Sequence, residues 1–246
     1  MKKNLTALPV YNEVETVHEV LDQVVRYCDH VLVIDDGSTD GTAAALASRS
    51  DITVVTHQEN AGYGAALMTA FRYAIGNGYD AVVTIDCDGQ HEPQRIQDLV
   101  DRLESDQADI VSGSRYLKKF DLNSEAPAQR RWINQQVTKE INERLGFKLT
   151  DAFCGFKAYR VEALKKLRLS EAGYAMPLEL WVQAACNKLT VTEMAVPLIY
   201  LDENRTFGGD LDDGATRLNY YYEVLQNSID RSVSDCPDLQ ARELAG

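Results

Sequence analysis

The sequence predicts an α/β protein built on one mostly parallel sheet with helices on both faces. Short apolar runs alternate with longer amphipathic stretches from Leu5 to Ser112. One run, within His30–Asp36, is continuously apolar, which is typical of a strand buried on both faces. The 45% content of apolar residues is sufficient for a substantial core. Strands that alternate with helices in this way indicate parallel pairing.

Strands and helices follow one another regularly in the first half of the chain. The expected strands are Leu5–Val10, His30–Asp36, Ile52–Thr56, Asp80–Ile85 and Asp109–Ser112. The expected helices are Glu13–Tyr27, an alanine-rich helix that opens at Asp40, Ala65–Ile75 and Pro93–Leu103. The first of these helices has apolar residues at a helical period. Asp40 is a good helix cap, and Pro93 suits a first helical turn.

The second half of the chain loses this alternation. Helices are expected at Gln129–Leu145, Ala175–Asn187 and Ala215–Arg231, and a strand broken by Pro197 at Thr190–Leu201. Residues 118–128 and 202–214 are polar and rich in turn formers, so both segments are expected to be loops. Because no linker interrupts the chain, we expect a single domain over 1–246 in which 117–246 is a C-terminal extension.

Composition excludes several classes of protein. A net charge of −13 argues against nucleic acid as a partner and against adsorption to an anionic membrane by charge alone. The five cysteines are widely spaced and form no CxxC pair, which predicts reduced thiols. No apolar run approaches the roughly 18 residues of a membrane span. We expect a cytoplasmic protein and leave open a peripheral position at a membrane.

Polar motifs follow three of the predicted strands. They are PVYNE at 9–13, DDGSTDGT at 35–42 and DCDGQ at 86–90. In an open parallel sheet, ligands bind beyond the carboxyl ends of the strands. The three motifs are therefore expected to converge on one edge of the sheet.

The third motif carries two carboxylates one residue apart. In an extended chain Asp86, Asp88 and Gln90 would share a face, and their oxygens would suit Mg²⁺ or Mn²⁺. The alternative is that Asp88 and Gly89 form a turn and Asp86 only ends the strand. That alternative is favoured for an isolated motif, but the two neighbouring motifs favour a metal site, because like charges this close repel unless a cation separates them.

Five motifs in order resemble those of the inverting family-two glycosyltransferases. They are PVYNE, VIDDGSTDGT, TIDCDGQHEP, GSRY at 113–116 and DAFCGFKAYR at 151–160, and the resemblance runs from Leu5 to about Arg205. The branch of dolichyl-phosphate mannose and polyprenyl-phosphate sugar synthases is the most similar. The resemblance implies a GT-A fold with a Rossmann-like sheet, a nucleotide-sugar-binding half at 1–116, and an acceptor-side half at 117–246 with a C-terminal helix.

The resemblance also implies roles for single residues. The donor nucleotide would be bound by Pro9, Tyr11, Glu13, Asp36 and Asp86, and the metal by Asp86, Asp88 and Gln90. The residues that would bind phosphate or the acceptor are Arg115, either Arg130 or Arg131, Glu179 and Arg205. Asp151 and Arg115 are the catalytic candidates. Asp151 is the base if the acceptor is a hydroxyl, and could only orient other groups if it is an ionised lipid phosphate.

These roles predict a metal-dependent transfer of a hexose, with inversion, from a GDP- or UDP-sugar to a polyprenyl or dolichyl phosphate. The late loop departs from that branch because it lacks the lysine that is usual there: residues 204–210 end in Asp210, and Asp212 and Asp213 follow. Acidic groups disfavour a phosphate acceptor, so a saccharide or small-molecule hydroxyl stays an alternative. A nucleotidyltransferase would need a basic, glycine-rich motif near the first strand. A non-catalytic nucleotide-sugar binder would not need the metal motif or Asp151.

Overall fold

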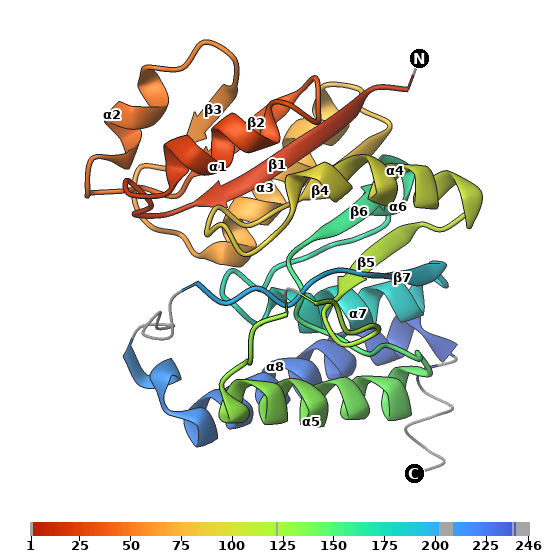
Figure 1. Ribbon diagram of the computed structural model, residues 1–246. Coiled ribbons are helices and arrows are strands. Elements are labelled where there is room, and N and C mark those ends of the chain that lie inside the picture. The colour runs from red at the N-terminus through yellow and green to blue at the C-terminus, as the bar shows by residue number, and fades with distance from the viewer. Residues whose placement is uncertain (1, 122, 202–208, 238, 240–246) are drawn as a thin grey trace.

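A computed structural model describes residues 2–121, 123–201, 209–237 and 239. Its strands form one sheet in the order β3-β2-β1-β4-β6-β5-β7 (Figure 1). The strands are β1 (Asn4–Val10), β2 (Val31–Asp35), β3 (Thr53–Thr56), β4 (Ala81–Thr84), β5 (Ile110–Ser114), β6 (Lys157–Arg160) and β7 (Val191–Ala195). Neighbouring strands are parallel except at β6, which is antiparallel to both β4 and β5. The predicted α/β class is confirmed.

Helices cover both faces of this sheet. They are α1 (Val17–Val24), α2 (Thr42–Ala47), α3 (Tyr63–Gly76), α4 (Ile96–Ser105), α5 (Ala128–Leu145), α6 (Val161–Leu164), α7 (Met176–Cys186) and α8 (Gly214–Ser232), with short 3₁₀ turns η1 (Pro93–Arg95), η2 (Gly209–Asp212) and η3 (Val233–Asp235). One core cluster joins the sheet to α1, α2 and α4, and a second joins the other face to α3, α6 and α7. A third cluster packs α5 and α8 against α7.

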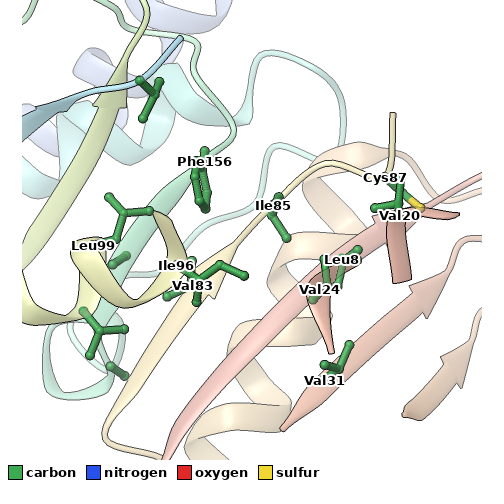
Figure 2. Packing of buried hydrophobic residues seen from close by; sticks show 14 of the residues in the cluster. Leu8, Val20, Val24, Val31, Val83, Ile85, Cys87, Ile96, Leu99 and Phe156 are labelled. Carbon is green, nitrogen blue, oxygen red and sulfur yellow. The ribbon is translucent and has the colours of Figure 1, made fainter. Parts of the chain in front are cut away.

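The side chains of β1 alternate between the two core clusters. Leu8 and Val10 belong to the first cluster, and Leu5 and Ala7 belong to the second. Figure 2 shows Leu8 with other members of the first cluster from β2, β4, α1 and α4. The alternation follows from the strand period of two, and burial of both faces explains why the strands are almost continuously apolar.

The structure corrects the expected elements at several places. The first helix is shorter than predicted, because residues 14–16 and 25–27 form turns. The strand β6 was not predicted, since its sequence, KAYR, has a charge at each end. It forms because β4 and β5 supply hydrogen-bonding partners on both sides, which no local pattern can reveal.

The sheet order places the predicted motifs side by side. Strands β2, β1 and β4 are adjacent and parallel, with Val10 paired to Asp35 and Ala7 paired to Thr84. Their carboxyl ends therefore lie at one edge of the sheet, and the predicted convergence is confirmed. In the part of the chain that the structure describes, no helix has the length and apolar character needed to cross a bilayer.

Candidate active site

A cavity of about 340 Å³ lies beyond the carboxyl ends of β1, β2 and β4 and is also lined by residues of α5, α7 and α8. It is lined by many of the residues singled out in the sequence: Pro9, Tyr11, Glu13, Asp36, Asp86, Asp88, Gln90, Arg115 and Arg130. Arg131, Asp151 and Glu179 are not part of this lining. Arg205 lies outside the described residues.

The first two motifs are joined by hydrogen bonds. The backbone N–H of Asn12 donates to Ser38 Oγ at 3.0 Å, and the N–H of Thr39 donates to Asn12 Oδ1 at 2.8 Å. The N–H of Glu13 donates to Thr42 Oγ1 at 2.9 Å. Each segment therefore fixes the backbone of the other at the rim of the cavity.

Asp36 is buried and holds a third segment in place. Its Oδ1 accepts from the N–H of Ala61 at 3.0 Å and its Oδ2 from the N–H of Gly62 at 2.8 Å. Nδ1 of His57 lies 2.6 Å from the same Oδ1. Both carboxylate oxygens are engaged within the protein, so Asp36 shapes the cavity wall. Its predicted contact with the donor nucleotide stays a prediction.

The metal motif lies in a turn and not in an extended strand. β4 ends at Thr84, Gly89 has a φ of 72°, and the N–H of Gln90 donates to Asp88 Oδ1 at 3.0 Å. The prediction that strand periodicity aligns the motif is therefore wrong, and the turn alternative describes the backbone correctly. Asp86, Asp88 and Gln90 nevertheless all line the cavity.

Asp86 is held by neighbours from α3 and from two loops. The hydroxyl of Tyr63 donates to its Oδ1 at 3.0 Å, and Nε2 of His91 lies 3.5 Å from its Oδ2. A Cβ atom at Gly155 would overlap the carboxylate, so only glycine leaves room for it there. Burial and the charge of Asp86 raise the pKa of Tyr63, which therefore keeps the proton that it donates.

The oxygens of this motif fit a hard divalent cation. Within the described residues there is no group of three or more His, Cys, Asp or Glu side chains suited to a metal. Mg²⁺ and similar ions are commonly held by one or two carboxylates, with waters and substrate phosphates as further ligands. Two carboxylates and an amide oxygen on one cavity wall are such a partial set.

Asp151 and Arg115 form a buried ion pair beside the cavity. Arg115 donates from Nε to Oδ2 at 2.7 Å and from Nη2 to Oδ1 at 2.9 Å, and Asn134 donates to Oδ1 at 2.7 Å. Burial alone would raise the pKa of Asp151, but the charge and hydrogen bonds of Arg115 and the amide of Asn134 lower it to about 2. The carboxylate of Asp151 is thus held in its ionised form, and which of its two expected roles it has stays a prediction.

The sequence leaves open which arginine of the pair at 130 and 131 faces the cavity. Arg130 lines it, and its Nη1 donates to the hydroxyl of Tyr200 at 3.4 Å, whereas Arg131 is exposed. Tyr200 is itself fixed by Ser124, whose Oγ accepts from the Tyr200 N–H at 3.1 Å. Arg130 and Arg115 thus reach the same cavity from different elements, and their binding of phosphate stays a prediction.

Glu179 is buried behind the cavity wall. Its Oε2 accepts from the N–H of Ser170 and from that of Glu171, both at 2.7 Å, and its Oε1 accepts from the Ser170 hydroxyl at 2.8 Å. The segment that it holds leads to Tyr174, which lines the cavity and stacks on Tyr63 with ring centroids 5.9 Å apart. The structure therefore places Glu179 behind the cavity wall and outside its lining, and its binding of phosphate or acceptor stays a prediction.

Several cavity residues were not singled out as site residues in the sequence. They are Tyr63, Asn134, Tyr174, Tyr200, Arg217 and Tyr221. Tyr221 also packs α8 into the core, because it belongs to the third core cluster. No local motif marks these residues. They come from α3, α5 and α8 and from loops, and only the packing of those elements brings them together.

Comparison with known proteins identifies the family. The family model for glycosyl transferase family 2 matches residues 6–168. The chain is 32% identical over 205 residues to a polyprenol monophosphomannose synthase from Mycolicibacterium smegmatis, covering 79% of this chain and 77% of the relative. It is 30% identical over 217 residues to an undecaprenyl-phosphate mannosyltransferase from Micrococcus luteus, covering 83% and 88%.

A solved structure shares the fold. It is the glucosyl-3-phosphoglycerate synthase from Mycobacterium tuberculosis in complex with Mn²⁺, UDP and glucosyl-3-phosphoglycerate, with a TM-score of 0.68 and 21% identity over 96% of this chain and 80% of that one. This likeness confirms the predicted GT-A fold. From its motifs, its sheet and these matches, the chain belongs to glycosyl transferase family 2 and is a glycosyltransferase.

Proposed function

We propose that this glycosyltransferase moves a hexose from a nucleoside diphosphate sugar to a polyprenyl phosphate, with inversion at the anomeric carbon. The observation that carries the proposal is the buried ion pair of Asp151 with Arg115, beside a cavity that also contains Arg130. A carboxylate engaged in this way orients a cation well and accepts a proton poorly, because its pKa is about 2. The two relatives described above, which are named for polyprenol and undecaprenyl phosphate, support the same acceptor.

The two halves of the chain divide the substrates between them in this proposal. Residues 1–116 contribute the wall that carries Pro9, Tyr11, Glu13 and Asp36, which would bind the donor nucleotide. Residues 117–246 contribute Arg130, which with Arg115 would bind the acceptor phosphate. Arginine suits this role because its planar fork matches pairs of phosphate oxygens.

Asp86, Asp88 and Gln90 would hold a divalent ion, Mg²⁺ or Mn²⁺, at the donor diphosphate. Such an ion, when bound, supplies Lewis-acid stabilisation of the charge that develops on the departing nucleoside diphosphate. The protein's own contribution is to fix these side chains: Tyr63 donates to Asp86, and the N–H of Gln90 donates to Asp88. Gly155 leaves the space that the Asp86 carboxylate occupies.

The bond changes need no general base for this acceptor. An oxygen of the acceptor phosphate forms the new bond to the anomeric carbon, and the bond from that carbon to the diphosphate breaks with its electron pair on the diphosphate oxygen. A phosphate monoester is largely a dianion at neutral pH, since its second pKa is about 6. Arg115, held by Asp151, would keep the attacking phosphate in line. A hydroxyl acceptor would instead need a base, which is why the ion pair favours phosphate.

A direct assay with three acceptors tests the proposal. The purified protein is incubated with Mg²⁺ or Mn²⁺, a panel of labelled GDP- and UDP-sugars, and a polyprenyl phosphate, the matching polyprenol without phosphate, or free sugars. Labelled product is expected with the polyprenyl phosphate only. Product on the polyprenol or on sugars, and none on the phosphate, would overturn the proposed acceptor. Because the acceptor is a lipid, the same proposal places the enzyme at a membrane surface during turnover.

A further inference from the structure

A chain of hydrogen bonds runs from the middle of α3 to Asp36. Nη2 of Arg72 donates to Thr69 Oγ1 at 2.9 Å, and the same Oγ1 lies 3.0 Å from Nε2 of His57. Nδ1 of His57 lies 2.6 Å from Oδ1 of Asp36. Of these four residues only Asp36 lines the cavity. His57, in the loop after β3, therefore lies behind the cavity wall and outside its lining.

The imidazole of His57 is fixed at both of its nitrogens. Asp36 also accepts two backbone N–H groups, so it is the acceptor in this network and Nδ1 of His57 carries the proton between them. Nε2 faces the hydroxyl of Thr69, which can donate or accept, whereas the guanidinium of Arg72 only donates. A hydrogen bond to a carboxylate is stronger than one between neutral groups. His57 therefore holds the Asp36 side chain in one orientation.

Asp36 in turn fixes a stretch of the cavity wall, the segment Asn60–Tyr63. The carboxylate accepts the N–H groups of the two middle residues of this segment, at 3.0 and 2.8 Å, and three of its four residues line the cavity. The backbones meet closely here, because a Cβ atom at Gly37 would overlap the backbone of residues 59–60. A displaced Asp36 side chain would release both N–H groups and, with them, this part of the wall.

We propose that His57 is a positioning residue for the donor, which orients Asp36 and the segment Asn60–Tyr63 to receive the nucleoside of the sugar nucleotide. The inference rests on the proposed function, in which Asp36 binds that nucleotide. The protein uses three of the roughly four acceptor sites of the carboxylate, two at Oδ1 and one at Oδ2. Oδ2 can thus accept one more hydrogen bond, from an N–H of the base or a ribose hydroxyl. A carboxylate fixed before binding loses little further freedom on binding.

Calorimetric titration with UDP and with GDP, in the presence of Mn²⁺, tests this role without turnover. H57L removes both ring nitrogens and is expected to weaken binding of the nucleotide that the wild type prefers by about 10-fold. H57N keeps an N–H donor as many bonds from Cα as Nδ1, so it should restore most of this affinity. The matched control is H18L, which replaces an exposed histidine on α1 and should bind like the wild type.

A second pair of variants acts on the far side of the imidazole. T69V removes the hydroxyl beside Nε2 and keeps the shape of the side chain, so it should weaken nucleotide binding by a smaller factor than H57L. T69S keeps the hydroxyl and should bind like the wild type. If H57L does not fold, this pair carries the test by the same comparison. Equal binding by T69V and T69S would then overturn the inference.

Steady-state kinetics separate positioning from a general role in folding. H57L should raise the KM for the nucleotide sugar and leave the KM for polyprenyl phosphate unchanged. If H57L lowers only the melting temperature, or raises both KM values alike, His57 serves the fold and the inference is overturned. Equal loss of nucleotide affinity in H57N and H57L also overturns it, because the Nδ1 donor then has no part. Tight nucleotide binding by H57L refutes this inference alone, whereas a wild type that binds neither UDP nor GDP refutes the proposed function itself.

Discussion

Arg115 donates two side-chain hydrogen bonds, of 2.7 and 2.9 Å, to the carboxylate of Asp151. Its backbone N–H donates a third, of 3.1 Å, to the same carboxylate. Asp151 is fully buried, and Arg115 extends from there to the wall of the cavity. A carboxylate with this many donors stays ionised, and the arginine that it holds has a fixed direction. The proposal of an anionic acceptor rests on this pair, since it holds the guanidinium of Arg115 at the cavity wall.

The first prediction concerns the stability of this pair. The pKa of Asp151, about 2, lies below the value of about 3.9 for an unfolded Asp, so its stabilisation is present above pH 4 and is lost as the pH falls toward 2. D151N should lower the free energy of unfolding by about 2 kcal/mol at pH 7 and by progressively less at lower pH. Urea unfolding of both proteins at pH 7 and pH 3 checks this. A difference that stays constant with pH would contradict it. D98N, at an exposed position on α4, is the control.

The second prediction concerns the dependence of activity on pH. If Asp151 orients Arg115 and the acceptor is a phosphate monoester, kcat/KM for the acceptor should fall below about pH 6, where that phosphate takes up its second proton. D151N should reduce kcat/KM by about 10- to 100-fold, through the displaced arginine, and keep the same midpoint. Initial rates of the wild type and of D151N, measured between pH 5 and 8, give the two pH profiles of kcat/KM that test this. An acidic limb that disappears in D151N would show that Asp151 itself is the titrating base.

The third prediction uses the space beside Asp86. G155A introduces a methyl group that overlaps the Asp86 carboxylate, so the carboxylate must move. We expect kcat/KM to fall at least 10-fold and the thermal stabilisation by nucleotide sugar with Mn²⁺ to shrink. The control is G76A, at a helical glycine whose added Cβ would have nothing within 4 Å. Equal activity of G155A and G76A would contradict the proposed role of Asp86.

The fourth prediction concerns the metal directly. Asp88 lines the cavity and its Oδ1 accepts the N–H of Gln90. D88A should abolish the part of the nucleotide-sugar thermal shift that depends on Mg²⁺ or Mn²⁺, because one of two carboxylate ligands is lost. The melting temperature is followed with the sugar nucleotide, with and without metal, and with D98A as the control. Survival of the metal-dependent shift in D88A would exclude Asp88 as a ligand.

The sequence predicts well whatever depends on local pattern. Apolar runs such as the one within His30–Asp36 mark buried strands, and the polar motifs behind them mark the edge where a ligand binds, because the ends of parallel strands meet there. Placement of Asp86 and Asp88 at the cavity follows from the same rule. The expectation that an extended chain aligns the side chains of Asp86 and Asp88 is wrong, because Gly89 allows a tight turn in place of a strand.

Tertiary structure decides what depends on partners distant in the chain. Strand β6 exists because two other strands pair with it, and Asp151 forms its ion pair because the fold brings Arg115, 36 residues earlier, within hydrogen-bonding reach. Arg217 enters the site only because Gly214 lets α8 approach α5. The sequence by itself thus determined the α/β class, the edge of the sheet at which the motifs meet, and the family. The ionised state of Asp151, its pairing with Arg115, and the presence of Arg130 rather than Arg131 in the cavity lining depend on the tertiary structure. Burial and distance in three dimensions set the energy of each charge.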